Sequence, residues 1–96
     1  MALLDDAEVA RSLERVPGWE RHGDAIERSV RLGDFRAAMA FVNTVAEAAE
    51  QADHHPDILI RWNTVDLTLS THSEGGLTGK DFSLAARINE LVPDMV

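Results

Sequence analysis

Cysteine is absent from this 96-residue chain, so disulfides, thiolate nucleophiles and zinc–thiolate sites are excluded. Basic residues are scarce, because nine Lys and Arg stand against 17 Asp and Glu, a formal net charge of -8. A binder of nucleic acid or of anionic lipid needs a basic face, so both classes are disfavoured. Glycine (six) and proline (three) are also few, and 45% of the residues are apolar. This balance indicates a globular chain rather than a disordered one.

Long apolar runs are missing as well. None approaches the roughly 20 residues that a membrane helix needs. The first six residues have neither the basic region nor the apolar core of a signal peptide. We therefore expect no membrane partner and a cytoplasmic location. The length fits a single domain over residues 1–96, with a core thin enough that oligomerisation would be a natural supplement.

Apolar periodicity and turn residues predict a hairpin–helix order that occurs twice after a leading helix. The expected elements are a helix over residues 5–14, a hairpin over 19–32, a helix over 34–53, a hairpin over 57–70 and a helix from 78 to about 92. This order predicts an α+β fold of two layers: a β-β-α-β-β-α antiparallel sheet with helices on one face, preceded by a short N-terminal helix.

Helical and strand spacing also predict which side chains share a face. The helix over 34–53 should bury one apolar stripe, namely Phe35, Met39, Val42, Ala46 and Ala49. The second hairpin should turn at Asn63-Thr64, with alternating apolar residues in each arm: Ile58, Ile60 and Trp62, then Val65, Leu67 and Leu69. In the first hairpin, Arg28 falls on the face of the apolar residues, which weakens the alternation.

Three of the four histidines gather in one part of the sequence, as His54-His55-Pro56 and His72. A histidine at a helix C-terminus can simply favour the negative end of the helix dipole. Two adjacent histidines before a proline indicate more, because neighbouring side chains of an extended segment point opposite ways, so one can line a cleft while the other braces it. His72 leaves a predicted strand for a loop, where functional residues collect. Imidazoles can transfer protons near neutral pH.

Two carboxylates accompany these histidines. Glu50 lies four residues before His54, one helical turn back, and is either solvated surface or a support for an imidazole. Asp81 follows Thr78 at the spacing of a capping box, so it can cap the last helix, act in catalysis, or both. Trp19 and Trp62 can each stack on a flat heterocycle or belong to the core or an interface.

A metal site built from the three histidines and a carboxylate is a further alternative. Such ligands suit zinc or iron. Adjacent histidines rarely converge on one ion, however, so we do not expect a metal.

The order Glu50, His54-His55-Pro56, Trp62, His72 and Asp81, at these spacings, resembles the pterin-4a-carbinolamine dehydratase family. The likeness extends over about residues 10–92 and includes Gly18-Trp19, Asp34-Phe35, the run 69–72 and the run 76–78. It implies a β-β-α-β-β-α fold. It also implies a hydro-lyase that removes water from 4a-hydroxytetrahydropterin to give quinonoid dihydropterin, without a metal or organic cofactor.

The resemblance further implies roles for individual residues. The catalytic set would be His54, His55 and His72, with Glu50 and Asp81 as supporting carboxylates. Pterin-binding residues, acting largely through the backbone, would be Asp53, Ser70, Thr71 and Ser73, together with Trp19. Which histidine is acid and which is base stays open.

The family also implies partners. The reaction would serve tetrahydrobiopterin recycling beside an aromatic amino-acid hydroxylase, and the chain would form a homodimer or homotetramer. Some members bind transcription factors or assist the assembly of other enzymes. The alternative function is therefore a non-catalytic interaction module on the same scaffold.

Overall fold

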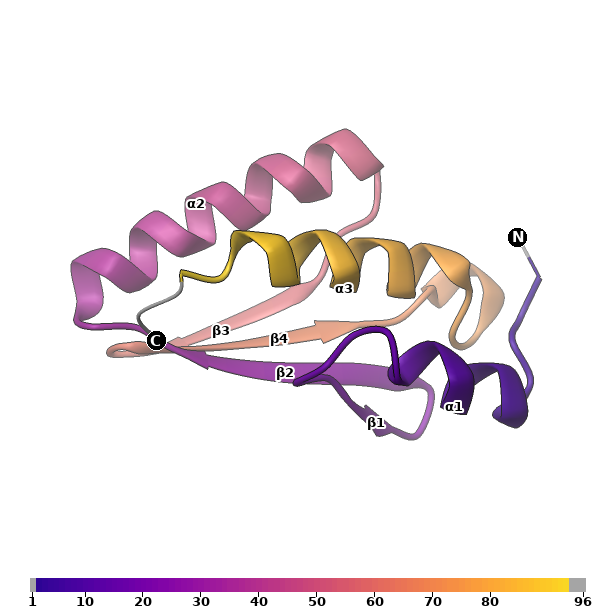
Figure 1. Cartoon of the computed structure of the whole chain (residues 1–96). Helices are drawn as coiled ribbons and strands as arrows, with labels where there is room; N and C mark the ends of the chain where they lie inside the picture. Colours follow the sequence, from indigo (N-terminus) through magenta and orange to yellow (C-terminus); the bar gives the residue numbers. More distant parts are fainter. Residues whose placement is uncertain (1, 94–96) are drawn as a thin grey trace.

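The computed structural model describes residues 2–93, and its elements follow the order that the sequence predicts (Figure 1). In chain order they are α1 (Asp6–Leu13), β1 (Glu20–His22), β2 (Ala25–Arg31), α2 (Phe35–Ala52), β3 (Asp57–Arg61), β4 (Thr64–Leu69), the short 3-10 turn η1 (His72–Glu74) and α3 (Gly79–Leu91).

The four strands form one antiparallel sheet in the order β1-β2-β4-β3. Helices α2 and α3 lie side by side over one face of this sheet, and α1 lies beside the β1–β2 end (Figure 1). The two hairpins are therefore joined through the central pair β2 and β4. The predicted α+β class, with an antiparallel β-β-α-β-β-α arrangement after a leading helix, is confirmed.

Each helix begins at a side chain that accepts a hydrogen bond from the first turn. Asp5 caps α1, Asp34 caps α2 and Thr78 caps α3, and the first and last of these form full capping boxes. Helix α2 ends at Asp53, whose φ of 50° lies in the left-handed region. That conformation turns the chain sharply away from the helix axis, and the histidine pair follows immediately.

The core lies between the sheet and the helices. Alternate residues of the central strands point into it and are fully buried, as the paired positions Ile26 with Leu69 and Val30 with Val65 show. The opposite face of the sheet is polar. There Ser29 donates a hydrogen bond to Asp66 at 2.5 Å, and Arg61 donates to the same carboxylate. One face is thus apolar and covered, while the other carries hydrogen-bonded polar side chains.

Arg28 lies on the core-facing side of β2, where its guanidinium forms a hydrogen bond within the protein. Its guanidinium donates to the Asn89 side chain, which also accepts from the indole nitrogen of Trp19 at 2.8 Å. Burial lowers the pKa of the Arg28 guanidinium because desolvation disfavours its charge. The interruption in the apolar alternation is thus a partly buried polar contact between β2 and α3.

Two details of the sequence prediction are wrong. The buried face of α2 differs from the predicted stripe: of that stripe only Ala49 is buried, and Phe35 is 52% exposed. The residues facing the core are Ala38, Phe41, Val45, Ala48 and Ala49. Alanines and other apolar residues of α2 lie on several of its faces, so periodicity alone could not identify the face that packs on the core. The second hairpin turns at Trp62-Asn63, one residue earlier than predicted, because Trp62 adopts a left-handed φ of 51°.

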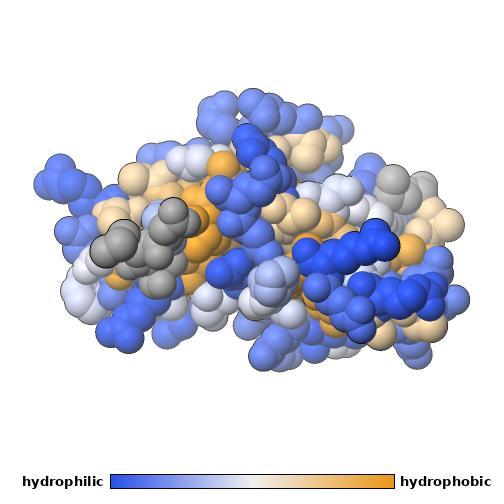
Figure 2. All heavy atoms as spheres, in the orientation of Figure 1, coloured by the Kyte–Doolittle hydropathy of each residue, from blue (hydrophilic) through white to orange (hydrophobic). Residues whose placement is uncertain are grey.

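Strand β3 forms an edge of the sheet, with β4 as its only neighbour in the described sheet. Leu59 is 56% exposed there, and Trp62 in the following turn is 66% exposed. Elsewhere, Figure 2 shows mainly hydrophilic residues with apolar patches between them on the face that it presents. Within residues 2–93, no helix combines the length and the apolar character required to cross a bilayer.

Candidate active site

One hollow of about 260 Å³ lies between the end of α2 and the loop after β4, and seven of the predicted site residues line it. Its lining consists of Asp53, His54, His55, Ser70, Thr71, His72, Ser73 and Lys80. The left-handed turn at Asp53 supplies the first three from one side, and the β4–η1 connection supplies the next four from the other. Residues far apart in the sequence therefore meet at one end of the sheet.

His54, which lines this hollow, is held by a buried carboxylate. Its Nε2 lies 2.6 Å from Oδ1 of Asp81, and the two side chains are 10% and 0% exposed. With Nε2 engaged by the carboxylate, Nδ1 is the ring nitrogen that remains for another partner. A carboxylate that holds one nitrogen of an imidazole fixes its tautomer and stabilises the imidazolium when the ring accepts a proton.

Asp81 is itself held by two threonines. Its Oδ2 accepts from the Thr71 hydroxyl at 2.8 Å and from the backbone N–H of Thr78 at 2.9 Å. The hydroxyls of the two threonines are 2.8 Å apart. Because Thr71 gives its only hydroxyl proton to Asp81, the Thr78 hydroxyl must donate to Thr71. The network therefore runs from Thr78 through Thr71 to Asp81, and the predicted capping residue also supports a histidine.

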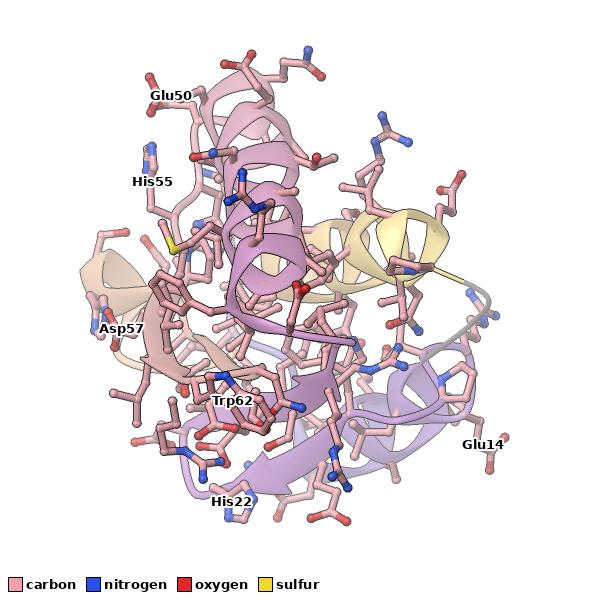
Figure 3. All side chains as sticks on the ribbon, turned by 90° about the vertical axis from the view of Figure 1, so that its left-hand side faces the viewer. Glu14, His22, Glu50, His55, Asp57 and Trp62 are labelled. Carbon is pink, nitrogen blue, oxygen red and sulfur yellow. The ribbon has the colours of Figure 1, made fainter. Side chains whose placement is uncertain are left out.

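His55 forms a second, more exposed pair. Its Nε2 lies 2.5 Å from Oε2 of Glu50, and the side chains are 56% and 73% exposed. Figure 3 shows Glu50 at the end of α2 with the His55 ring directed toward it. Glu50 thus contacts a histidine, but the ring is that of His55 rather than that of His54. The turn at Asp53 explains the exchange, because it directs the His54 side chain toward α3 and leaves the next ring beside α2.

His72 lines the hollow from the first residue of η1 and is exposed. Within residues 2–93, no side-chain hydrogen bond to its ring is found. It also borders a second hollow of about 390 Å³, which includes Asp24 and Asp57. The three histidines therefore differ: one is fixed and buried, one is paired at the surface, and one is open to solvent.

Comparison with known proteins bears on what this arrangement does. A model of the family described as "Pterin 4 alpha carbinolamine dehydratase" matches residues 2–91. The chain belongs to this family. It is accordingly a hydro-lyase, a dehydratase that acts on pterins.

Individual relatives agree. Two proteins provisionally named pterin-4-alpha-carbinolamine dehydratase are similar over almost their whole length. The protein from Thermomicrobium roseum is 57% identical over 95% of this chain and 98% of its own, and that from Nocardia farcinica is 58% identical over 93% and 94%.

Solved structures show the same fold. The crystal structure described as a transcriptional coactivator/pterin dehydratase from Brucella melitensis has a TM-score of 0.89 and 37% identity, and covers 94% of this chain and 98% of its own. A pterin dehydratase-like protein described as a RuBisCO assembly factor in the alpha-carboxysome has a TM-score of 0.69 at 22% identity, with 81% and 93% covered. The second likeness concerns the fold alone.

Two of the predicted pterin-binding residues, Trp19 and Thr71, are buried in the structure. Trp19 is 5% exposed and packs in the core with its indole bonded to Asn89, and it does not line the hollow. Thr71 is 4% exposed. Its backbone N–H donates to Gly76 and its carbonyl accepts from Gly75, so its polar groups are already used. Thr71 thus lines the hollow while its hydroxyl donates to Asp81.

His54 and His55 each form a hydrogen bond with a different carboxylate. Within residues 2–93, no group of three or more His, Cys, Asp or Glu side chains is placed to hold a metal ion. One residue that the predicted site lacked is Lys80, which lines the hollow from the first turn of α3. It is the only lysine of the chain and directly precedes Asp81, which is the signal that could have identified it.

Proposed function

We propose that the chain dehydrates 4a-hydroxytetrahydropterin by histidine general acid–base catalysis, with His54 as the base. The observation that carries this proposal is the buried pair of His54 and Asp81 at 2.6 Å, beside a hollow that two further histidines line. The carboxylate leaves Nδ1 of His54 as the basic nitrogen and would stabilise the imidazolium that forms.

The reaction requires two proton transfers. The C4a–O bond breaks, and an acid protonates the departing hydroxyl to form water. A base removes the proton from the neighbouring ring nitrogen, and the electron pair of that N–H bond forms the new C=N bond of quinonoid dihydropterin. We assign the base to His54 and the acid to His72, whose exposed ring can exchange protons with solvent. His55, braced by Glu50, would position the pterin.

Dehydration of enzymatically generated 4a-hydroxytetrahydropterin tests this assignment. His54→Ala and His72→Ala should each slow turnover by about 10²–10⁴-fold, the usual contribution of a positioned acid or base. His22→Ala is the matched control, since His22 lies on β1, far from His55 in Figure 3. Circular dichroism would establish that every variant is folded. Wild-type turnover in both site variants would refute the assignment.

We also propose a homo-oligomer, a dimer or tetramer. The support is the open edge of β3, where Ile58 and Leu59 are 37% and 56% exposed, and the exposed Phe35 at the start of α2. An apolar edge strand is an available pairing surface. Recycling of tetrahydrobiopterin beside an aromatic amino-acid hydroxylase, a single domain over residues 1–96 and a cytoplasmic location stay predictions of the sequence.

A non-catalytic interaction module is the second candidate. The same exposed edge favours it, and one structural relative is described as a transcriptional coactivator/pterin dehydratase. Folded protein without any pterin turnover, together with one stoichiometric protein partner, would favour this second function over the first.

A further inference from the structure

A groove between α2 and α3 opens beside the histidine hollow. Its volume is about 310 Å³, and its floor includes Ala48 and Leu84, which are 5% and 2% exposed. The two helices diverge toward the end where α2 finishes and α3 begins (Figure 1). Small side chains on this part of α2, including Ala52, leave the space between the diverging helices open.

The groove and the histidine hollow share a wall. His54 and Lys80 line both. The His54 ring cannot swing freely, because its Nε2 is held by Asp81 at 2.6 Å. A molecule whose ring system occupies the histidine hollow can therefore extend past this fixed wall into the groove. The hollow alone, at about 260 Å³, is smaller than the ~300–1,000 Å³ of most small-molecule sites.

The charges at the groove differ from those of the rest of the molecule. Lys80 and Arg87 both line it, seven residues apart and thus on the same side of α3. Of the residues described, no Asp or Glu lines it, in a chain whose net charge is -8. Within residues 2–93, Lys80 has no carboxylate within 4.0 Å, and Arg87 has one exposed neighbour, Glu90, at 4.0 Å. Such an exposed pair is weak, so both cations can attract an anion.

We propose that this groove binds an anionic substituent of the pterin, a phosphate or a carboxylate joined to the ring through a short apolar linker. The inference rests on the proposed function, because it takes the pterin ring to occupy the histidine hollow. The apolar floor at Ala48 and Leu84 would contact the linker, and Lys80 and Arg87 would pair with the terminal charge. The enzyme would then prefer acidic pterins to neutral ones.

Matched substrates test the preference. The 4a-hydroxy adducts of 6-hydroxymethyltetrahydropterin, of its phosphate monoester and of its carboxymethyl ether share one ring and differ in the terminal group. We expect kcat/KM to be about tenfold higher for an acidic adduct than for the neutral one, since a hydrogen bond to a charged group contributes roughly one such factor. The two acidic arms show whether phosphate or carboxylate is preferred. Higher ionic strength should reduce the preference by screening.

Substitutions locate the preference in the groove. Arg87→Gln and Lys80→Gln should each lower the acidic-to-neutral ratio by about threefold to tenfold, and Glu90→Gln should raise it by freeing Arg87. Arg36→Gln is the control, because it removes one positive charge from the exposed start of α2, outside the groove. A ratio near one in the wild type, or a ratio that none of the groove substitutions changes, would overturn the proposal and leave the groove to another occupant.

A binding measurement separates this inference from the proposed function. Calorimetric Kd values for the corresponding 7,8-dihydropterins require no catalysis. Tighter binding of the acidic compounds that depends on Arg87 would support the groove even if no adduct were dehydrated. Turnover of the neutral adduct without any acidic preference in binding would refute the groove and retain the dehydratase.

Discussion

Replacing Asp81 by Asn is the sharpest test of the catalytic assignment, because the two side chains have the same shape. Asp81 is fully buried and accepts from His54, Thr71 and Thr78. The Asn carbonyl can still accept from both threonines. Its NH₂ group then faces Nε2 of His54, where a second donor is not tolerated, so the ring must carry its proton on Nδ1 instead. His54 would lose its basic nitrogen.

The expected effect on turnover is large. Loss of a general base costs about 10²–10⁴-fold, and the same exchange in a serine-protease triad costs about 10⁴-fold because the histidine takes the wrong tautomer. The effect on stability is smaller. Exchanging a hydrogen bond to a charged group for a neutral one costs about 1–2 kcal/mol, which lowers the melting temperature of a domain of this size by about 5–15 °C. Both quantities come from one buried contact.

The assay is the dehydration rate measured well below the melting temperature of the variant. Asp66→Asn is the matched control: the same chemical change on the polar sheet face, where it removes a partner of Arg61 and should leave turnover unchanged. A double variant with His54→Ala should be no slower than His54→Ala alone, because both act through one ring. A folded Asp81→Asn enzyme that retains more than a tenth of wild-type turnover would refute the reasoning.

Three further predictions concern other parts of the molecule. Gly18→Ala should destabilise the fold by about 1–3 kcal/mol, because φ of Gly18 is +90° and the added Cβ would lie 3.0 Å from the Arg28 guanidinium. Gly33→Ala is the control, because its added Cβ meets open space. Equal melting temperatures for the two variants would contradict this prediction. Glu50→Gln should change the free energy of unfolding by less than about 0.5 kcal/mol, because the pair of Glu50 and His55 is exposed. It should also slow turnover far less than Asp81→Asn does. Equal losses of turnover in the two variants would contradict the greater weight given to the buried pair. Leu59→Lys should shift the protein toward monomer in analytical ultracentrifugation by placing a charge beside the open sheet edge, and an unchanged sedimentation coefficient would remove β3 from the interface.

The element order could be predicted from the sequence because its signals are local. Asp34 caps a helix by accepting from a residue three positions later, and Asp53 ends the same helix three residues before Pro56. The alternating residues of β4 likewise face the core as their spacing predicts. Each of these features depends on residues within a few positions of one another.

The orientation of α2 could not be predicted in this way. Its apolar residues occupy more than one face, and only the sheet beneath it selects Ala38 and Phe41 over Phe35. The turn at Trp62 is similar, because a left-handed φ is uncommon for a residue with a large side chain. In both cases tertiary packing decides between local alternatives of similar energy.

The site residues were found in part by spacing and in part by family resemblance. Spacing placed Asp81 at the start of a helix and Glu50 near the histidine pair. It could not show that Asp81 lies 2.6 Å from a ring 27 positions earlier, or that Glu50 pairs with the second histidine rather than the first. Those contacts depend on how the chain leaves α2 and where α3 packs, which no local pattern contains.

The capping box of α3 has one more consequence. The backbone N–H of Thr78 donates to the carboxylate that holds His54, so the amide can exchange with deuterated solvent only when that bond opens. Its exchange rate in nuclear magnetic resonance therefore measures how often the helix start releases the Asp81 carboxylate. A single amide proton thus reports the local stability of the contact that holds Asp81 beside His54.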